Sequence, residues 1–142
     1  MPEALALAAM VDMPAALQTF MAFDFGTRRT GVAFGNRLLR SASALPTLTV
    51  QGEARLQQIQ ACLAEWQPAA LVVGIPFHPD GAEHEMTLQA RKFARTLRSR
   101  FKLAVFEVDE RYSTTEALAN GAADPDAGAA CVILEQFLRG LS

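Results

Sequence analysis

The sequence predicts an α/β fold with a mixed five-stranded sheet, three antiparallel strands followed by two parallel ones, and helices on both faces. One observation is the stretch FDFGTRRTGVAFGN, residues 23–36, in which a short Gly/Arg turn separates two apolar runs, as in a β-hairpin. The other is that short continuous apolar runs later alternate with stretches of helical periodicity, as in parallel strands joined by helices. The chain of 142 residues can form one core. We expect an N-terminal extension over residues 1–18 and one domain over residues 19–142.

The first three strands are expected over residues 19–25, 30–35 and 41–50. The links between them are of hairpin length, and hairpin-linked strands pair antiparallel. A helix then follows from about Glu53 to Gln67, where apolar residues recur at helical spacing until Pro68 ends the pattern.

Two more strands are each reached through a helix. The run LVVGIP at 71–76 is short and wholly apolar, and the turn HPDG leads from it into a helix at about 83–101. The run LAVFEV at 103–108 is the fifth strand. A short helix is expected after it, opened by Ser113 and Glu116 at capping-box spacing, and a last helix from Asp124-Pro125 to about Arg139. This order is typical of ribonuclease H-like folds, with the first strand at the centre of the sheet.

Composition narrows the class of protein further. About half of the residues are apolar and a fifth are charged, which is ordinary for a globular domain. No apolar run reaches the roughly 18 residues of a membrane span. Cys62 and Cys131 are far apart and have no CxxC or His neighbours, so we expect free thiols and a cytoplasmic protein.

Acidic residues occur at three points that this strand order can bring together. Asp24 lies in the first strand, Asp109 and Glu110 end the last strand, and Asp126 opens the final helix. Gathered carboxylates repel one another, and a partly hydrated Mg²⁺ relieves that repulsion. Such a site can activate water and stabilise charge developing on a phosphodiester. The interpretation also explains why a carboxylate interrupts an apolar strand, since a buried acid is costly when it is alone.

Each acid also has a purely structural interpretation. Asp24 could be a hydrogen-bonded residue at a strand end. Asp109 or Glu110 could pair with Arg111, and the helix dipole favours any acid at the position of Asp126.

A row of basic residues on the helix at 83–101 is a second candidate feature. Its members follow spacings of four, three and four, so they form one narrow stripe: Arg91, Arg95, Arg98 and Lys102. No acid occurs between positions 91 and 102. The stripe could track nucleic-acid phosphates, extended by Arg28 and Arg29 of the first hairpin, or it could be a solvated helix face.

Five blocks of the sequence, in the same order, resemble the YqgF (RuvX-like) family. The blocks are FDFGTRRTGVAFGN, VVGIPFHPDGAE, ARKFARTLRSRF, VDERYSTTEA and DAGAACVILEQFL. They span roughly residues 20–139. Members of this family are ribonuclease H-fold proteins related to Holliday-junction resolvases and are regarded as nucleases that mature the 5′ end of 16S ribosomal RNA.

The resemblance implies a catalytic and metal-binding set of Asp24, Glu110 and Asp126, with Asp109 beside it, holding Mg²⁺ or Mn²⁺. It also implies a substrate-facing block formed by Arg111, Ser113 and Thr114. One departure is the segment LANGAADP before Asp126, which is shorter than is usual in the family.

The function expected on these grounds is metal-dependent endonucleolytic hydrolysis of structured RNA, with precursor 16S ribosomal RNA as substrate and the ribosome as a candidate partner. Two alternatives remain open. One is a resolvase of branched DNA, and the other is a non-catalytic RNA-binding factor of ribosome maturation or transcription. An ATPase with the same strand motif is disfavoured, because the chain is too short for two nucleotide-clamping lobes.

Overall fold

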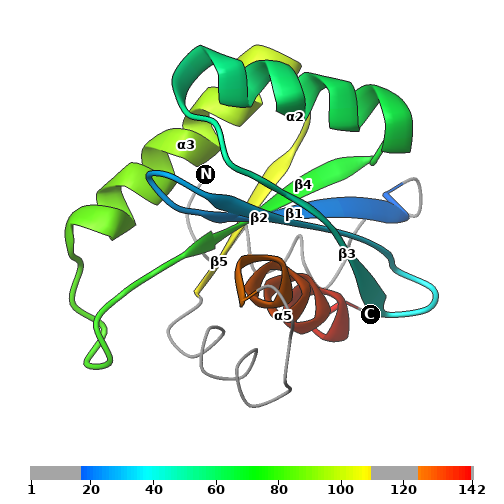
Figure 1. The fold of residues 1–142 in the computed structure, drawn as a ribbon. Coiled ribbons are helices and arrows are strands. Elements are labelled where there is room, and N and C mark those ends of the chain that lie inside the picture. The colour runs from blue at the N-terminus through cyan, green and yellow to red at the C-terminus, as the bar shows by residue number, and fades with distance from the viewer. Residues whose placement is uncertain (1–16, 110–124, 142) are drawn as a thin grey trace.

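The computed structural model describes residues 17–109 and 125–141, and it contains one mixed sheet of five strands (Figure 1). The strand order is β3-β2-β1-β4-β5, which puts the first strand at the centre. The strands are β1 Thr19–Phe25, β2 Thr30–Asn36, β3 Ser41–Leu48, β4 Ala70–Ile75 and β5 Val105–Asp109. β1 pairs antiparallel with β2, and β2 with β3, whereas β4 is parallel to both β1 and β5. The predicted sheet is therefore confirmed.

Helices cover both faces of this sheet, also as predicted. α2 (Gly52–Trp66) and α3 (Glu85–Phe101) lie on one face, and α5 (Pro125–Arg139) lies on the other (Figure 1). The short helix expected around residues 113–120 lies outside the described residues.

Alternation along β1 divides the interior into two cores. Met21 and Phe23 are fully buried on the side of α2 and α3. Phe20 and Ala22 are fully buried on the other side, against α5. Because successive side chains of a strand point to opposite faces, the residues that follow in β1 continue this alternation.

The start of α3 differs by two residues from the expected start at residue 83. His84 is the N-cap, and its Nδ1 accepts a hydrogen bond from the amide of Met86 at 3.1 Å. The hydroxyl of Thr87 accepts a hydrogen bond from the amide of His84 at 3.1 Å and donates one to the carbonyl of Pro76. A capping box built on histidine thus ends the loop and starts the helix.

The approach of α5 to the hairpin depends on one glycine. A Cβ on Gly35 would collide with the carbonyl oxygen of Ser41 and press on Leu134 of α5, whose side chain is fully buried. Gly35 therefore lets β3 and α5 come close to β2.

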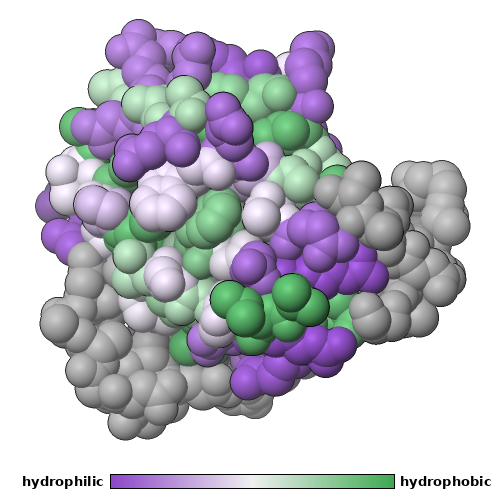
Figure 2. Space-filling view, turned by 90° about the vertical axis from the view of Figure 1, so that its right-hand side faces the viewer, coloured by the Kyte–Doolittle hydropathy of each residue, from purple (hydrophilic) through white to green (hydrophobic). Residues whose placement is uncertain are grey.

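The turn between β2 and β3 lies on the side of the molecule seen in Figure 2. Its residues Leu38 and Leu39 are 84% and 70% exposed. On this face apolar patches alternate with hydrophilic side chains (Figure 2). Within residues 17–109 and 125–141, no helix has the length and apolar character needed to cross a bilayer.

Candidate active site

The turn from β1 into β2 is held in one shape by its own glycine and by the start of α2. A Cβ on Gly26 would collide with the carbonyl oxygen of Arg29 across the turn, so glycine is required there. The Gln51 side-chain amide donates a hydrogen bond to the carbonyl of Arg28 at 3.1 Å. Arg55 Nη2 donates to the carbonyl of Thr27 at 2.8 Å. Two side chains from the α2 region therefore fix the backbone that carries Arg28 and Arg29.

Arg55 is a functional candidate that the sequence-based reasoning missed. Its side chain is buried in α2, its Nε donates to the carbonyl of Val50 at 3.0 Å, and its guanidinium lies 4.9 Å from the ring centroid of Phe25. Burial lowers the pKa of Arg55, although an arginine stays charged at neutral pH. The available signal was its position four residues before the buried Ile59, on the inward face of the helix.

Asp24 is half-buried near the end of β1, opposite Gly31 of β2. The alternation of β1 gives it the same face as Phe20 and Ala22, which is the face covered by α5. The carboxylate that interrupts the first apolar strand therefore lies towards the helix that carries Asp126.

Asp126 lies in the first turn of α5 and is joined directly to the hairpin turn. Arg29 Nε donates to Asp126 Oδ2 at 2.6 Å, and the two side chains are 52% and 35% exposed. The contact spans 97 positions of sequence. The structure thus brings Asp24, Arg29 and Asp126 to one end of the sheet, on the α5 side.

Asp109 has a different position. Along β5, Val105 packs in the core under α3, and Glu107 makes ion pairs with α3 arginines. Asp109 follows at the same parity and lines a small hollow of about 260 Å³ with Phe77 and Arg91. The structure therefore places Asp109 on the α3 side and does not bring it to Asp24. Glu110 lies outside the described residues.

The carboxylates of Asp24 and Asp126 are the donor type that Mg²⁺ prefers, and one or two carboxylates completed by water suffice for it. Among residues 17–109 and 125–141, no group of three His, Cys, Asp or Glu side chains could hold a metal ion. The donor set on the α5 side fits a hydrated hard cation and gives no soft or imidazole ligands for a transition metal.

The basic stripe of α3 is divided by its contacts. Arg91 pairs with Glu83 and approaches Glu107 at 4.0 Å. Arg98 donates to the carbonyl of Val105 at 2.7 Å and to Glu107 at 3.1 Å. These two arginines therefore fasten α3 to the edge strand β5. Glu107, the acid near both arginines, comes from β5, so spacing along the helix could not indicate this contact.

Arg95 and Lys102 are exposed. Arg95 lines a shallow hollow on the outer side of α3, and Lys102 is the C-cap residue of that helix, with a left-handed φ of 59°. Arg28 is also exposed, at the hairpin turn. The predicted substrate-facing residues Arg111, Ser113 and Thr114 lie outside the described residues.

Comparison with solved structures supports the fold. A T. thermophilus RuvC, solved in complex with a Holliday junction substrate, superposes with a TM-score of 0.53 at 16% identity, over 85% of this chain and 93% of that one. The predicted ribonuclease H-like fold is thus confirmed by a structural neighbour.

Sequence comparison gives much closer relatives. A protein of Polaromonas sp. (strain JS666 / ATCC BAA-500) named "Putative pre-16S rRNA nuclease" is 65% identical over 137 residues, which is 96% of this chain and 99% of that protein. A protein of the same name from Paraburkholderia phytofirmans is 51% identical over 142 aligned positions, covering 93% and 96% of the two chains.

A family model described as "RuvX: Holliday junction resolvase" matches residues 18–140. The match covers almost the whole chain and agrees with the resemblance carried by the five sequence blocks. The chain therefore belongs to the RuvX family.

Proposed function

We propose that this protein is a divalent-metal-dependent endonuclease that hydrolyses structured RNA, with precursor 16S ribosomal RNA as its substrate. The observation that carries the proposal is the half-buried carboxylate of Asp24 at the end of the central strand, on the face where Arg29 holds Asp126. Support for the RNA substrate comes from the name of the relative that shares 65% of the aligned residues.

Asp24 and Asp126 would hold the cation, Mg²⁺ or Mn²⁺, with Glu110 as a third carboxylate. Asp109 lies on the α3 side of the sheet, so we assign this role to Glu110, as the family resemblance implies, and not to Asp109. The bound cation would supply an activated water and would stabilise charge on the phosphodiester.

The residues of the chain itself would orient the site. Arg29 holds Asp126 by a charge-assisted hydrogen bond and, with Arg28, adds positive charge at the turn where an incoming phosphate would lie. Arg111, Ser113 and Thr114 are proposed to contact the substrate.

Branched DNA is the second candidate substrate. The family description and the RuvC structure with its Holliday junction favour keeping it. The third possibility, a non-catalytic RNA-binding factor, is one of the outcomes of the experiment below. We propose a cytoplasmic site of action, in keeping with the free cysteines Cys62 and Cys131.

The deciding experiment compares cleavage of a precursor 16S RNA fragment and a four-way DNA junction by the purified protein, with Mg²⁺ and with EDTA. Asp24→Asn is the test variant. Glu65→Gln is the matched control, because Glu65 is exposed near the far end of α2 and its loss removes an equal charge. We expect RNA cleavage that requires the cation, is lost in Asp24→Asn and is kept in Glu65→Gln. Cleavage of the junction alone would transfer the proposal to DNA, and tight RNA binding without any cleavage would establish the non-catalytic factor.

A further inference from the structure

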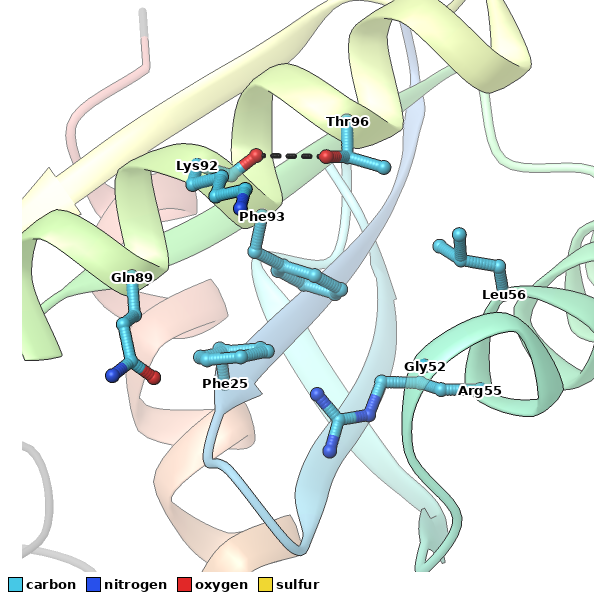
Figure 3. Close-up of a pocket in the computed structure, with 8 residues that line it drawn as sticks. All are labelled: Phe25, Gly52, Arg55, Leu56, Gln89, Lys92, Phe93 and Thr96. Carbon is cyan, nitrogen blue, oxygen red and sulfur yellow. Dashed lines mark hydrogen bonds between the residues drawn. The ribbon is translucent and has the colours of Figure 1, made fainter.

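A cavity of about 480 Å³ lies between α2 and α3, on the face of the sheet opposite Asp24 (Figure 3). Phe25 and Phe93 bound it on one side, and Leu56 and Arg55 bound it on the other (Figure 3). The two rings lie 4.7 Å apart between centroids. This volume is within the range of small-ligand sites, and its lining is apolar and aromatic with a few polar groups.

The polar groups at the wall suit a heterocycle. Gln89 lines the wall, where its side-chain amide donates a hydrogen bond to Glu85 at 3.2 Å and keeps its carbonyl oxygen as an acceptor, and the hydroxyl of Thr96 donates a hydrogen bond to the carbonyl of Lys92 at 3.0 Å (Figure 3). The guanidinium of Arg55 lies over the Phe25 ring, 4.9 Å from its centroid, at the border of the same space, and both of its hydrogen bonds within the described residues go to backbone carbonyls. Aromatic rings, a guanidinium plane and an amide are the groups with which proteins contact an unstacked nucleobase.

The charges around the cavity indicate the path by which a nucleic-acid strand would leave it. A second hollow on the outer side of α3 shares Lys92 and Thr96 with the first, so the two are contiguous. The described residues that line the two hollows include no acid but four cations: Arg55, Lys92, Arg95 and Arg100. Of these, Arg100 is paired with Glu53. The positive surface along Lys92 and Arg95 is complementary to a phosphate backbone.

We propose that this cavity binds one unstacked nucleobase of the substrate strand, with the adjoining phosphates on Lys92 and Arg95. The proposal rests on the proposed function, because Phe25 follows Asp24 directly in β1. The two side chains lie on opposite faces of the same end of that strand. A nucleic acid that reaches the carboxylates from the α5 side can therefore pass a single-stranded flank around the hairpin turn to this cavity.

The test uses the full chain labelled with nitrogen-15 and carrying Asp24→Asn, so that nucleic acid is bound and not cut. Amide signals of Gly52, Thr96 and the Gln89 side chain are followed by NMR during titration with AMP, adenosine and ribose 5-phosphate. We expect AMP to move these signals and ribose 5-phosphate to need at least roughly tenfold higher concentration, because stacking provides most of the base contact. Equal responses to AMP and ribose 5-phosphate, or no response to AMP, would overturn the proposal.

Two variants separate the base from the phosphate. Phe25→Leu keeps an apolar side chain and should weaken AMP binding by roughly tenfold through the lost ring, with its melting temperature recorded as the check on folding. Lys92→Gln should abolish the preference for AMP over adenosine. Arg139→Gln, an exposed charge at the end of α5, is the matched control and should change nothing. A Phe25→Leu protein that is folded and binds AMP normally would contradict the stacking role.

A final titration identifies the occupant. A single-stranded RNA oligonucleotide should move the same amide signals at lower concentration than AMP and should displace AMP. If AMP binds but the oligonucleotide neither displaces it nor moves these signals, the cavity is an effector site for free nucleotides and the proposal is overturned. Failure of the cleavage assay with unchanged wild-type protein would reject the proposed function, whereas these amide shifts would still decide the base-binding role.

Discussion

Arg95 and Arg98 lie three residues apart on α3, and the structure predicts that removing Arg98 lowers stability whereas removing Arg95 weakens nucleic-acid binding. Arg98 is bonded to the carbonyl of Val105 at 2.7 Å and to Glu107 at 3.1 Å. Arg95 is exposed and lines the hollow that we assign to phosphates. We therefore compare Arg98→Met with Arg95→Met, which both keep an unbranched apolar stem and remove the charge.

The magnitude for Arg98→Met follows from its two contacts. The bond to the Val105 carbonyl contributes about 1 kcal/mol, a typical net value for a partly exposed hydrogen bond. The ion pair adds about 0.5 kcal/mol, since its side chains are 40% and 32% exposed and solvent screens the attraction. A loss of about 1.5 kcal/mol should lower the melting temperature by about 5 °C in a domain of this size. Arg95→Met should change stability by less than about 0.5 kcal/mol.

Binding should show the reverse pattern. Arg95→Met should lower the slope of log affinity against log salt by about 0.7–0.9 for one lost phosphate contact. Thermal unfolding and salt-dependent fluorescence anisotropy with one RNA oligonucleotide measure the two effects. Adding Glu107→Gln to Arg98→Met should lower the unfolding free energy little further, because Arg98→Met has already removed the Arg98–Glu107 ion pair. Equal melting temperatures for the two arginine variants would refute the assignment of Arg98 to the α3–β5 contact.

Three further outcomes are expected. Asp24→Asn should leave the metal-free unfolding free energy unchanged or raised, because one charge leaves a cluster of like charges; a clear loss in urea melts would return Asp24 to a structural role. Gly26→Ala should destabilise by about 1–3 kcal/mol, because its Cβ collides with the Arg29 carbonyl, and it should reduce cleavage; an unchanged melt would show that the turn tolerates the Cβ. Burial, and then the charge of Glu135, raises the pKa of the Cys131 thiol. The folded state thus favours the protonated thiol, so this contribution is present at neutral pH and is lost as pH rises through the folded-state pKa. Urea melts from pH 7 to 10 should show a smaller alkaline loss of stability in Cys131→Ala than in the unaltered chain, and identical pH profiles would exclude the effect.

The fold was predictable because its signals are local. Hairpin-length links specify antiparallel neighbours, and continuous apolar runs between amphipathic helices specify buried parallel strands. The start of α3, two residues later than expected, had no such local signal. It depends on the cap bond of His84 and on the hydrogen bond from Thr87 to the carbonyl of Pro76.

The site was predictable only in part. Asp24 interrupts an apolar strand and Asp126 follows a helix-starting proline, and these positions marked both as candidates. The alternation of β1 then places Asp24 on the face covered by α5, the helix that carries Asp126. The side occupied by Asp109 depends on where β5 begins, because a shift of one residue reverses every side chain. The acids that pair with Arg91 and Arg98 lie in the loop before α3 and in β5, so the periodicity of α3 itself could not reveal these ion pairs.

The contact between Arg29 and Asp126 also has a consequence for the order of events during synthesis. Chains fold as they emerge, the N-terminal part first. Until α5 has been made, the face of the sheet that carries Phe20 lacks the helix that covers it, and Asp126 is not yet present beside Arg29. Docking of α5 buries that apolar face and brings Asp126 to Arg29 in the same event. A nascent chain would therefore acquire stability and the capacity to cut nucleic acid together, and a partly made one would have neither.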